Sequence, residues 1–142
     1  MSADVAGGDA QLQPECYWTM ININAIANGD AHLIGDRITS KAVLIDTGSA
    51  AAAELILLPY LRAHRITELA AVLITHPHDD HYGGLLALLD SSIRIGRIYM
   101  STAPSAWLER ERHAHAIEEL AAIICRAAEH DIPVMEPGTF WK

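Results

Sequence analysis

The chain has 142 residues, which is the length of one ordinary domain and too short for two comfortable hydrophobic cores. With 51% hydrophobic and 20% charged residues, the composition is that of a globular protein and excludes a disordered chain. The formal charge of −8 disfavours sequence-independent nucleic-acid binding, which needs lysine and arginine on the phosphates. It does not exclude a phosphate-bearing substrate, because a bound metal ion can invert the local field.

The sequence shows no sign of export or membrane insertion. Residues 1–14 are small and polar, lack a basic region followed by an apolar core, and are expected to be a disordered lead-in. The apolar runs at 42–58 and 69–75 are interrupted by acidic residues or are too short to span a bilayer. Cys16 and Cys125 are far apart in sequence, so we expect two small buried hydrophobic residues and no disulfide. A soluble, cytoplasmic domain is therefore predicted.

Periodicity and turn residues predict alternating strands and helices along the chain. Strands are expected at residues 17–26, 31–35, 41–46, 69–75, 93–99 and 131–135. Helices are expected at 50–65 (in two pieces, with Pro59 in the first turn of the second), from 85–89, and at 104–129. The long helix would bury one stripe of residues: Trp107, Ala114, Ile117, Ala121, Ile124 and Ala128. This order predicts an α/β domain with helices packed on a sheet.

Three of the eight histidines fall within six residues, in the run THPHDDHYGG at 75–84. Imidazole and carboxylate are the ligands that zinc and other borderline divalent metals prefer. His76 and His78 directly follow a predicted strand and would project from its carboxyl end, where open α/β sheets form binding crevices. Asp80 and His81 would open a helix, and the following glycines allow a close backbone turn. The sequence therefore predicts a metal site here.

The other histidines give weaker signals. His113 and His115 are two apart on a predicted helix, about 200° around its axis, so they cannot share a metal and are expected on a solvated face. His64 and His130 lie near predicted helix carboxyl ends, where a partly charged imidazole is favourable. The role of His32, on a strand, stays open.

The motif T-H-x-H-x-D-H-x-G-G after an apolar strand resembles the metal-binding motif of the metallo-β-lactamase superfamily. The segment VLIDTGS (43–49) is similar to that family's first motif, an aspartate at a strand end. The segment NGDAHLI (28–34), with PYLRAHRI downstream, is most similar to the domain attached to ComEC/Rec2-type DNA-uptake proteins. The resemblance covers residues 17–135, nearly the whole chain.

This resemblance implies a four-layer αββα sandwich, present here mainly as its N-terminal βα half. It implies a site for two metal ions, usually zinc, with His76 and His78 on the first and Asp80 and His81 on the second. Asp46 would lie beneath them and orient ligands or the nucleophile, so Asp80 and Asp46 are the candidate catalytic residues. The implied activity is hydrolysis of an ester, amide or phosphodiester-type substrate by a zinc-bound hydroxide.

Family members carry three further ligands downstream: a histidine, a bridging aspartate and a final histidine. After the motif, the aspartates and histidines of this chain are Asp90, His113, His115, His130 and Asp131, and none follows an apolar strand and precedes a glycine-rich turn. We therefore expect residues 15–142 to be a domain truncated at its C-terminus, from a truncated gene, a fragment or a split protein. Such a chain should bind metal weakly, self-associate and hydrolyse slowly.

Two alternatives stay open. The chain could be a non-catalytic metal-binding or interaction module, or one half of a split hydrolase completed by a partner chain. It could also belong to another substrate branch, such as thioester or lactone hydrolases. Acidic charge favours a small-molecule substrate, whereas the NGDA resemblance favours a phosphodiester.

Overall fold

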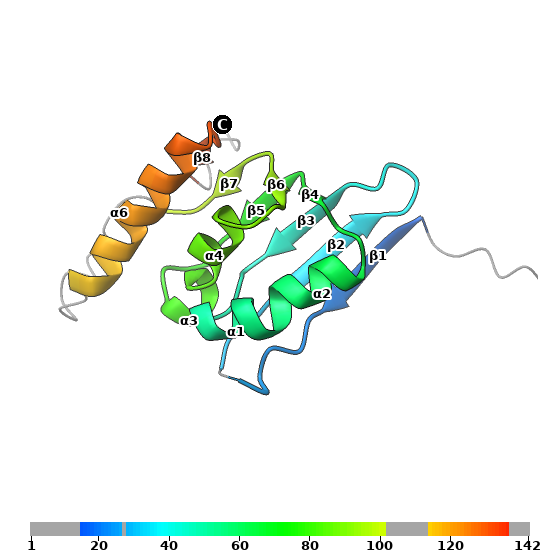
Figure 1. The fold of residues 1–142 in the computed structure, drawn as a ribbon, viewed down its shortest axis with the longest axis horizontal. Coiled ribbons are helices and arrows are strands. Elements are labelled where there is room, and N and C mark those ends of the chain that lie inside the picture. Colours follow the sequence, from blue (N-terminus) through cyan, green and yellow to red (C-terminus); the bar gives the residue numbers. More distant parts are fainter. Residues whose placement is uncertain (1–14, 27, 102–113, 137–142) are drawn as a thin grey trace, which may run out of the picture.

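A computed structural model describes residues 15–26, 28–101 and 114–136 of the chain. Its strands are β1 (Cys16–Met20), β2 (His32–Asp36), β3 (Ala42–Ile45), β4 (Glu68–Leu69), β5 (Ala71–Leu73), β6 (Arg94–Ile95), β7 (Ile98–Tyr99) and β8 (Val134–Met135). The helical segments are α1 (Ala50–Ala52), η1 (Ala53–Leu57), α2 (Leu58–Ala63), α3 (Asp79–Tyr82), α4 (Leu85–Leu89) and α6 (Ala114–Glu129). Figure 1 shows their arrangement.

Six strands form one mixed sheet in the order β1-β2-β3-β5-β7-β8. The first three strands pair antiparallel, and β3, β5, β7 and β8 are parallel. The short strands β4 and β6 pair parallel in a separate two-stranded sheet. The predicted α/β class is confirmed, and the continuous apolar run at 41–46 forms the buried strand β3.

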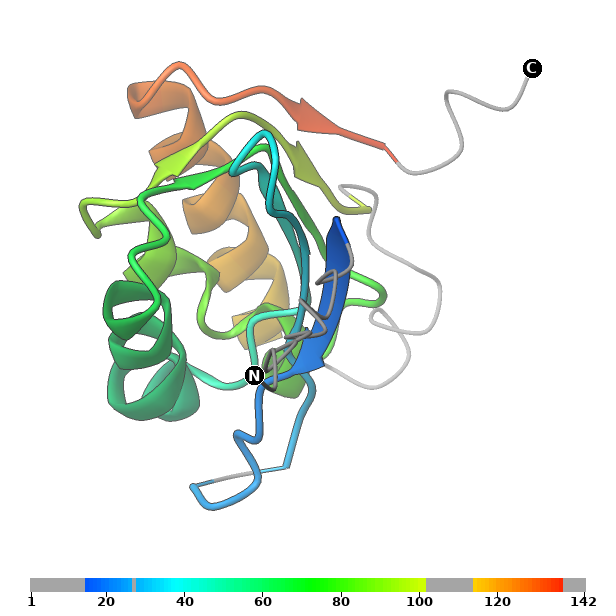
Figure 2. The same cartoon turned by 90° about the vertical axis from the view of Figure 1, so that its right-hand side faces the viewer.

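One face of the main sheet carries the helices, as the edge-on view in Figure 2 shows. The residues that point toward the helices are at most 1% exposed: Leu33, Leu44, Val72 and Ile98, which lie side by side across four strands. Side chains on a strand alternate between the two faces, so their neighbours point the other way. The hydrophobic core therefore lies between the helices and one face of the sheet.

The predicted helix at 50–65 forms as one run whose middle, η1, is a π-helix. Ser49 caps its start through its side-chain oxygen, and Pro59 stands in the first turn of α2 as predicted. The run ends in a Schellman motif, with the Ile66 amide 2.9 Å from the Leu61 carbonyl oxygen. Arg65 takes the left-handed position of that motif, at φ +57°, where glycine is usual.

Two predicted strands are each broken in two. The run at 69–75 becomes β4 and β5, and the run at 93–99 becomes β6 and β7. At the break Gly96 passes so close to Ala70 that a Cβ would lie 2.6 Å from its carbonyl oxygen. Only a residue without a side chain fits this crossing, and the chain leaves one sheet for the other there. At the other end of the chain, β1 stops at Met20, short of the predicted residue 26.

Helix α6 turns a different face to the core than predicted. Its buried residues are Leu120, Ile123 and Ala127, with Ala116 packed against the same core. Ile117 is 39% exposed, and Ala121 and Ala128 are also exposed, so the predicted stripe is wrong. Both rows are apolar at helical spacing, and packing against α4 selects the Leu120 row. The predicted stripe residue Trp107 lies outside the described residues.

The two cysteines are exposed, which corrects the prediction that both are buried. Cys16 lies on the edge strand β1, and Cys125 lies on α6 away from the Leu120 row. Both cysteines are free thiols. Within the described residues, no helix combines the length and apolarity needed to cross a bilayer.

The sheet face turned away from the helices is apolar; we call it the open face. Trp18 and Met20 on β1 are 67% and 60% exposed, and Ile34 on β2 is 42% exposed. Strand register extends this surface inward, because Ile34 pairs with Val43 on β3. No described helix lies on this face in Figure 2. Exposed apolar surface of this kind favours association.

We expect the chain by itself to self-associate through the open face. The double substitution Trp18→Lys and Ile34→Lys should shift the protein toward the monomer, since two charges would have to be desolvated. Leu55→Lys is the matched control, because Leu55 is 63% exposed but lies on the helical side. Sedimentation velocity over a range of concentrations measures the effect. A wild-type chain that stays monomeric, or an equal effect of Leu55→Lys, would contradict the expectation.

Candidate functional site

The histidine motif lies at the carboxyl ends of the parallel strands β3 and β5. Asp46 directly follows β3, and the segment from Thr75 to His78 follows β5. His78 occupies the N-cap position of the short helix α3, which carries Asp80 and His81. The structure therefore brings Asp46 together with the predicted ligands at one edge of the sheet, as the order of strands requires.

Asp46 is held in an unusual backbone conformation. Its φ is +58°, in the left-handed region that aspartate tolerates better than most residues. The residue is 2% exposed, and its carboxylate accepts three hydrogen bonds. The donors are the Thr75 amide (2.8 Å), the Thr75 hydroxyl (2.7 Å) and Nδ1 of His81 (2.9 Å). Asp46 is therefore a buried carboxylate whose burial is compensated by directed hydrogen bonds.

These hydrogen bonds decide which nitrogen carries the proton on two histidines. A carboxylate only accepts, so Nδ1 of His81 must be the protonated nitrogen. The Thr75 hydroxyl donates its single hydrogen to Asp46. Its oxygen lies 3.0 Å from Nδ1 of His76, so it must accept a hydrogen bond from that nitrogen. In the neutral rings of both His76 and His81, Nε2 is then left with its lone pair. That is the nitrogen form a metal requires.

Helix α3 is fastened to the turn that contains Asp46. The amide and hydroxyl of Thr47 donate to the His81 carbonyl oxygen at 2.7 and 2.9 Å, and the Gly84 amide donates to Gly48. A Cβ on Gly84 would collide with Ala53, so glycine serves here to let backbones approach rather than to reach an unusual φ. On its other side, the buried Tyr82 donates a 2.7 Å hydrogen bond to Glu119 of α6. Burial and this bond raise the pKa of Tyr82.

The three motif imidazoles lie against one another. The ring centroids of His76 and His81 are 3.8 Å apart, and those of His76 and His78 are 4.6 Å apart. The Asp80 carboxylate is 3.7 Å from Nε2 of His81. Burial, followed by the neighbouring His81 and His78 rings, holds the pKa of His76 below its ordinary value, which favours the neutral, ligating form.

The candidate metal ligands have the chemical groups that a metal needs, but their positions do not suit a single ion. Imidazole and carboxylate donors are gathered with the required tautomers, and a carboxylate backs one of the rings. However, in the described part of the chain no three His, Cys, Asp or Glu residues are placed to hold one ion. The ring planes of His76 and His81 are tilted by 49°, and those of His76 and His78 meet edge to face at 74°. The rings thus pack on one another and not around a common centre.

A small cavity of about 100 Å³ adjoins the motif. It is lined by Ile74, Thr75, His76, Pro77, Met100, Ser101 and Leu120. Its inner end is apolar, because Ile74, Met100 and Leu120 are all buried core residues. The cavity therefore offers room for a small apolar group next to His76.

The remaining histidines lie apart from this cluster. His64 caps α2 with Nδ1 2.9 Å from the Tyr60 carbonyl oxygen, and the exposed His115 pairs with Glu119 at 3.3 Å. His32 lies on the open face and stacks on Trp18, with ring centroids 5.7 Å apart. His130 follows the end of α6. His113 lies outside the described residues.

Thr75 is the functional residue that sequence reasoning missed. The sequence places Thr75 at the end of an apolar strand and at the start of the motif without giving it a role, yet its hydroxyl links Asp46 to His76. Its one sequence signal is a hydroxyl placed directly between a buried strand and the first motif histidine.

Comparison with known proteins places these features in a family. Residues 27–120 match the family model described as the metallo-beta-lactamase superfamily. A hydroxyacylglutathione hydrolase of Bdellovibrio bacteriovorus is 42% identical over 53 residues, which are 37% of this chain and 19% of that protein. The family match confirms the resemblance to the metallo-β-lactamase superfamily, whereas the finer likeness to the ComEC/Rec2-type domain stays a prediction.

The fold is shared with a solved structure of this superfamily. The structure of the hydrolase AbOPH in the beta lactamase superfamily aligns with a TM-score of 0.55 at 21% identity, over 77% of this chain and 43% of that one. The DIM-1 metallo-beta-lactamase aligns with a TM-score of 0.42 at 20% identity, over 72% of this chain and 45% of that one. The chain thus spans less than half the length of these relatives.

The hydrogen-bond chain through Thr75 can be tested in metal-free protein. Thr75→Val keeps the shape of the side chain but removes the hydroxyl, so His76 should shift from the Nδ1-protonated form toward Nε2 protonation. The loss of the bond to buried Asp46 should also lower the free energy of unfolding by about 1–2 kcal/mol. Imidazole ¹⁵N shifts report the tautomer, and urea denaturation reports stability.

Thr67→Val is the matched control, because Thr67 is an exposed threonine far from the motif. It should leave the His76 spectrum unchanged. An unchanged His76 tautomer in Thr75→Val would refute the assignment.

Proposed function

The chain belongs to the metallo-β-lactamase superfamily, and from this premise we propose that it is the motif-bearing part of a metal-dependent hydrolase. In this proposal His76, His78, Asp80 and His81 ligate zinc, and Asp46 is the positioning residue beneath them. The observation that carries the proposal is the buried carboxylate of Asp46 on Nδ1 of His81 at 2.9 Å. A carboxylate behind a histidine is the arrangement that orients metal-binding imidazoles in proteins.

The roles of the residues follow from their hydrogen bonds. Asp46 keeps the proton on the inner nitrogen of His81, and Thr75 does the same for His76. Asp80 lies at the rim of the cluster with a side chain 37% exposed, so it can meet a ligand without leaving its helix. When bound, zinc would polarise a substrate oxygen and make water nucleophilic near neutral pH.

We propose that further donors complete this site. A catalytic zinc ordinarily takes three protein ligands and a water, whereas four residues divided between two ions supply two each. The chain covers 43% of AbOPH and 19% of the hydroxyacylglutathione hydrolase it matches. The missing donors would come from a longer protein, a partner chain or a second copy. A non-catalytic metal-binding module is the alternative if nothing completes the site.

Two substrate classes have separate support. The match to a hydroxyacylglutathione hydrolase covers 53 residues and favours a thioester. The NGDAHLI resemblance favours a ComEC/Rec2-like role on a phosphodiester, and Gly29 of this segment packs against the backbone of Asp80. We propose the thioester as the primary class, because the small apolar cavity beside His76 suits the acyl group of such a substrate better than a charged phosphodiester.

Zinc content per chain, measured by elemental analysis, tests the metal site directly. We expect wild-type protein to bind zinc, and Asp46→Asn to lower its zinc affinity about 10- to 100-fold because the Nδ1 proton acceptor is lost. His78→Ala should lose zinc as well. His130→Ala is the matched control, since His130 is exposed and lies beyond the end of α6.

Hydrolysis assays on a hydroxyacyl-glutathione thioester and on bis(p-nitrophenyl) phosphate then separate the two substrate classes. Activity on either that is lost in His78→Ala and kept in His130→Ala supports a hydrolase. Zinc binding without hydrolysis of either compound, also after mixing with a chain that completes the fold, would favour the non-catalytic module. Equal zinc content in all variants would overturn the proposed ligands.

A further inference from the structure

Helix α3 carries the candidate ligands Asp80 and His81 but is too short to hold its own position. It has four residues, about one helical turn, so few hydrogen bonds can close within it. On one side it is fastened to the turn after β3, because the amide and hydroxyl of Thr47 donate to the His81 carbonyl oxygen. A helix held along one side can rotate about that side, so its orientation depends on what binds the other.

On its other side, α3 is bound to α6 by one side-chain hydrogen bond. The hydroxyl of Tyr82, the last residue of α3, donates to the Glu119 carboxylate at 2.7 Å. Tyr82 is only 1% exposed, so its hydroxyl depends on this acceptor and not on bulk water. Hydrogen bonds to an ionised acceptor are short and strong. A partly buried carboxylate therefore holds α3 from a helix that is distant in sequence.

The Glu119 carboxylate is itself held in place. The next residue along α6, Leu120, is buried, as is Ile123 one turn later, and this side of α6 packs against α4. One carboxylate oxygen accepts from Tyr82, and the other lies 3.3 Å from Nε2 of His115 on the preceding turn of α6. The acceptor for Tyr82 is thus presented from a part of α6 that the core fixes.

The same turn of α6 also reaches the other part of the histidine motif. Leu120 lines the small cavity of about 100 Å³ together with His76 and Pro77, which precede α3. Consecutive residues of α6 therefore serve the two parts of the motif. Glu119 holds the helix that carries His81, and Leu120 adjoins the segment that carries His76.

We propose that Glu119 is a positioning residue of the candidate metal site, which acts through the Tyr82 hydroxyl on the orientation of α3 and thereby on Asp80 and His81. Groups of a metal site must be held to within about 0.5 Å of their working positions, so a small rotation of α3 is enough to weaken binding. The inference rests on the proposed function for its metal. The hydrogen bond, however, is a property of the chain alone.

Zinc affinity, measured by competition with a chelator, tests the role of Glu119. Glu119→Ala and Tyr82→Phe should each lower the affinity about fivefold or more, because each removes the anchor of α3. The double variant should be no weaker than Glu119→Ala, since both substitutions break the same bond. Glu119→Gln should stay within about twofold of the wild type, because the amide oxygen still accepts from Tyr82.

The metal-free chain gives a second measurement, which a role in stability alone would not change. Glu119→Ala should shift the imidazole ¹⁵N resonances of His81 at a denaturant concentration where the chain stays folded, and Glu119→Gln should restore them. Glu118→Ala is the matched control, because Glu118 is the exposed neighbour on the same helix.

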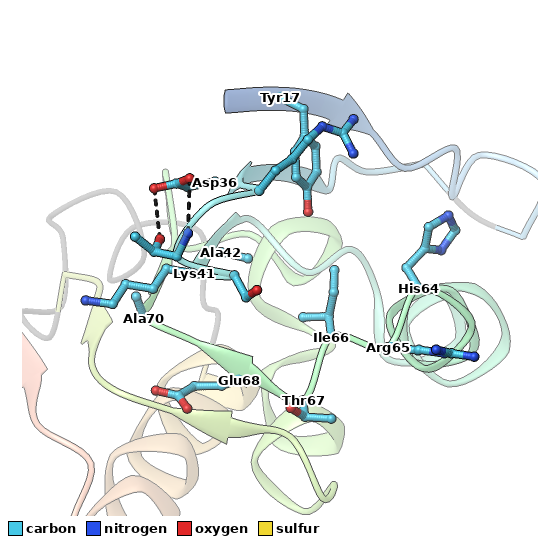
Figure 3. A pocket seen from close by; sticks show the side chains of 13 residues that line it. Tyr17, Asp36, Lys41, Ala42, His64, Arg65, Ile66, Thr67, Glu68 and Ala70 are labelled. Carbon is cyan, nitrogen blue, oxygen red and sulfur yellow. Dashed lines mark hydrogen bonds between the residues drawn. The ribbon is translucent and has the colours of Figure 1, made fainter. Parts of the chain in front are cut away.

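Glu68→Ala is a second control. The Glu68 carboxylate also accepts a 2.7 Å hydrogen bond, from Arg94, but it lies beside the hollow drawn in Figure 3, near the amino ends of β3 and β5. Because the motif follows the carboxyl ends of these strands, Glu68→Ala should change neither the zinc affinity nor the His81 resonances.

Three outcomes would overturn the proposal. They are a less stable Glu119→Ala variant with unchanged zinc affinity and unchanged His81 resonances, an equal loss in Glu119→Gln, and an equal loss in either control. A wild-type chain that binds no zinc would contradict the proposed function instead. The His81 resonances would then still decide whether Glu119 sets the orientation of α3.

Discussion

The buried carboxylate of Asp46 is the group on which the arrangement of the histidine motif depends. It joins the ends of two strands, because the residue follows β3 and accepts from the amide and hydroxyl of Thr75 after β5. It also fixes His81, which lies on a separate helix. An ionised group with 2% exposure is tolerated only because each of these donors is directed at it. The left-handed backbone at Asp46 is the strain that this geometry requires.

The sheet separates charge between its two ends. Acidic and imidazole groups collect where β3 and β5 end, and the exposed Arg37, Lys41 and Arg65 lie where the same strands begin. A strand of four residues spans only about 13 Å, so the two ends are near enough to share one rigid scaffold. They are far enough apart for water and salt to screen one from the other.

Sequence reasoning succeeded where a pattern of residues is compatible with one kind of secondary structure. The apolar run before Asp46 forms the predicted buried strand β3, and the last part of the run before Thr75 forms β5. The structure shows that these two strands pair in parallel, which places both residues at one edge. It failed for α6, which carries two apolar rows of residues. Only the contact with α4 decides that the row of Leu120 is buried and the row of Ile117 is not. The break at Gly96 depends on how closely Ala70 passes, which no local pattern encodes. The linking role of Thr75 likewise exists only in three dimensions.

The proton positions on the candidate metal ligands and the number of these ligands depend on different features of the fold. Residues 46, 75, 76 and 81 fix the proton positions among themselves, so the neutral rings of His76 and His81 both carry the lone pair on Nε2. The count of donors is not fixed this way, and the described rings are packed against each other instead of around a common centre. In the proposed metal site, a metal would compete with these ring contacts for each ligand. Additional ligands would favour the metal in that competition. The hydrogen bonds beneath the rings would stay the same, because Asp46 and Thr75 bind the nitrogens that face away from a metal.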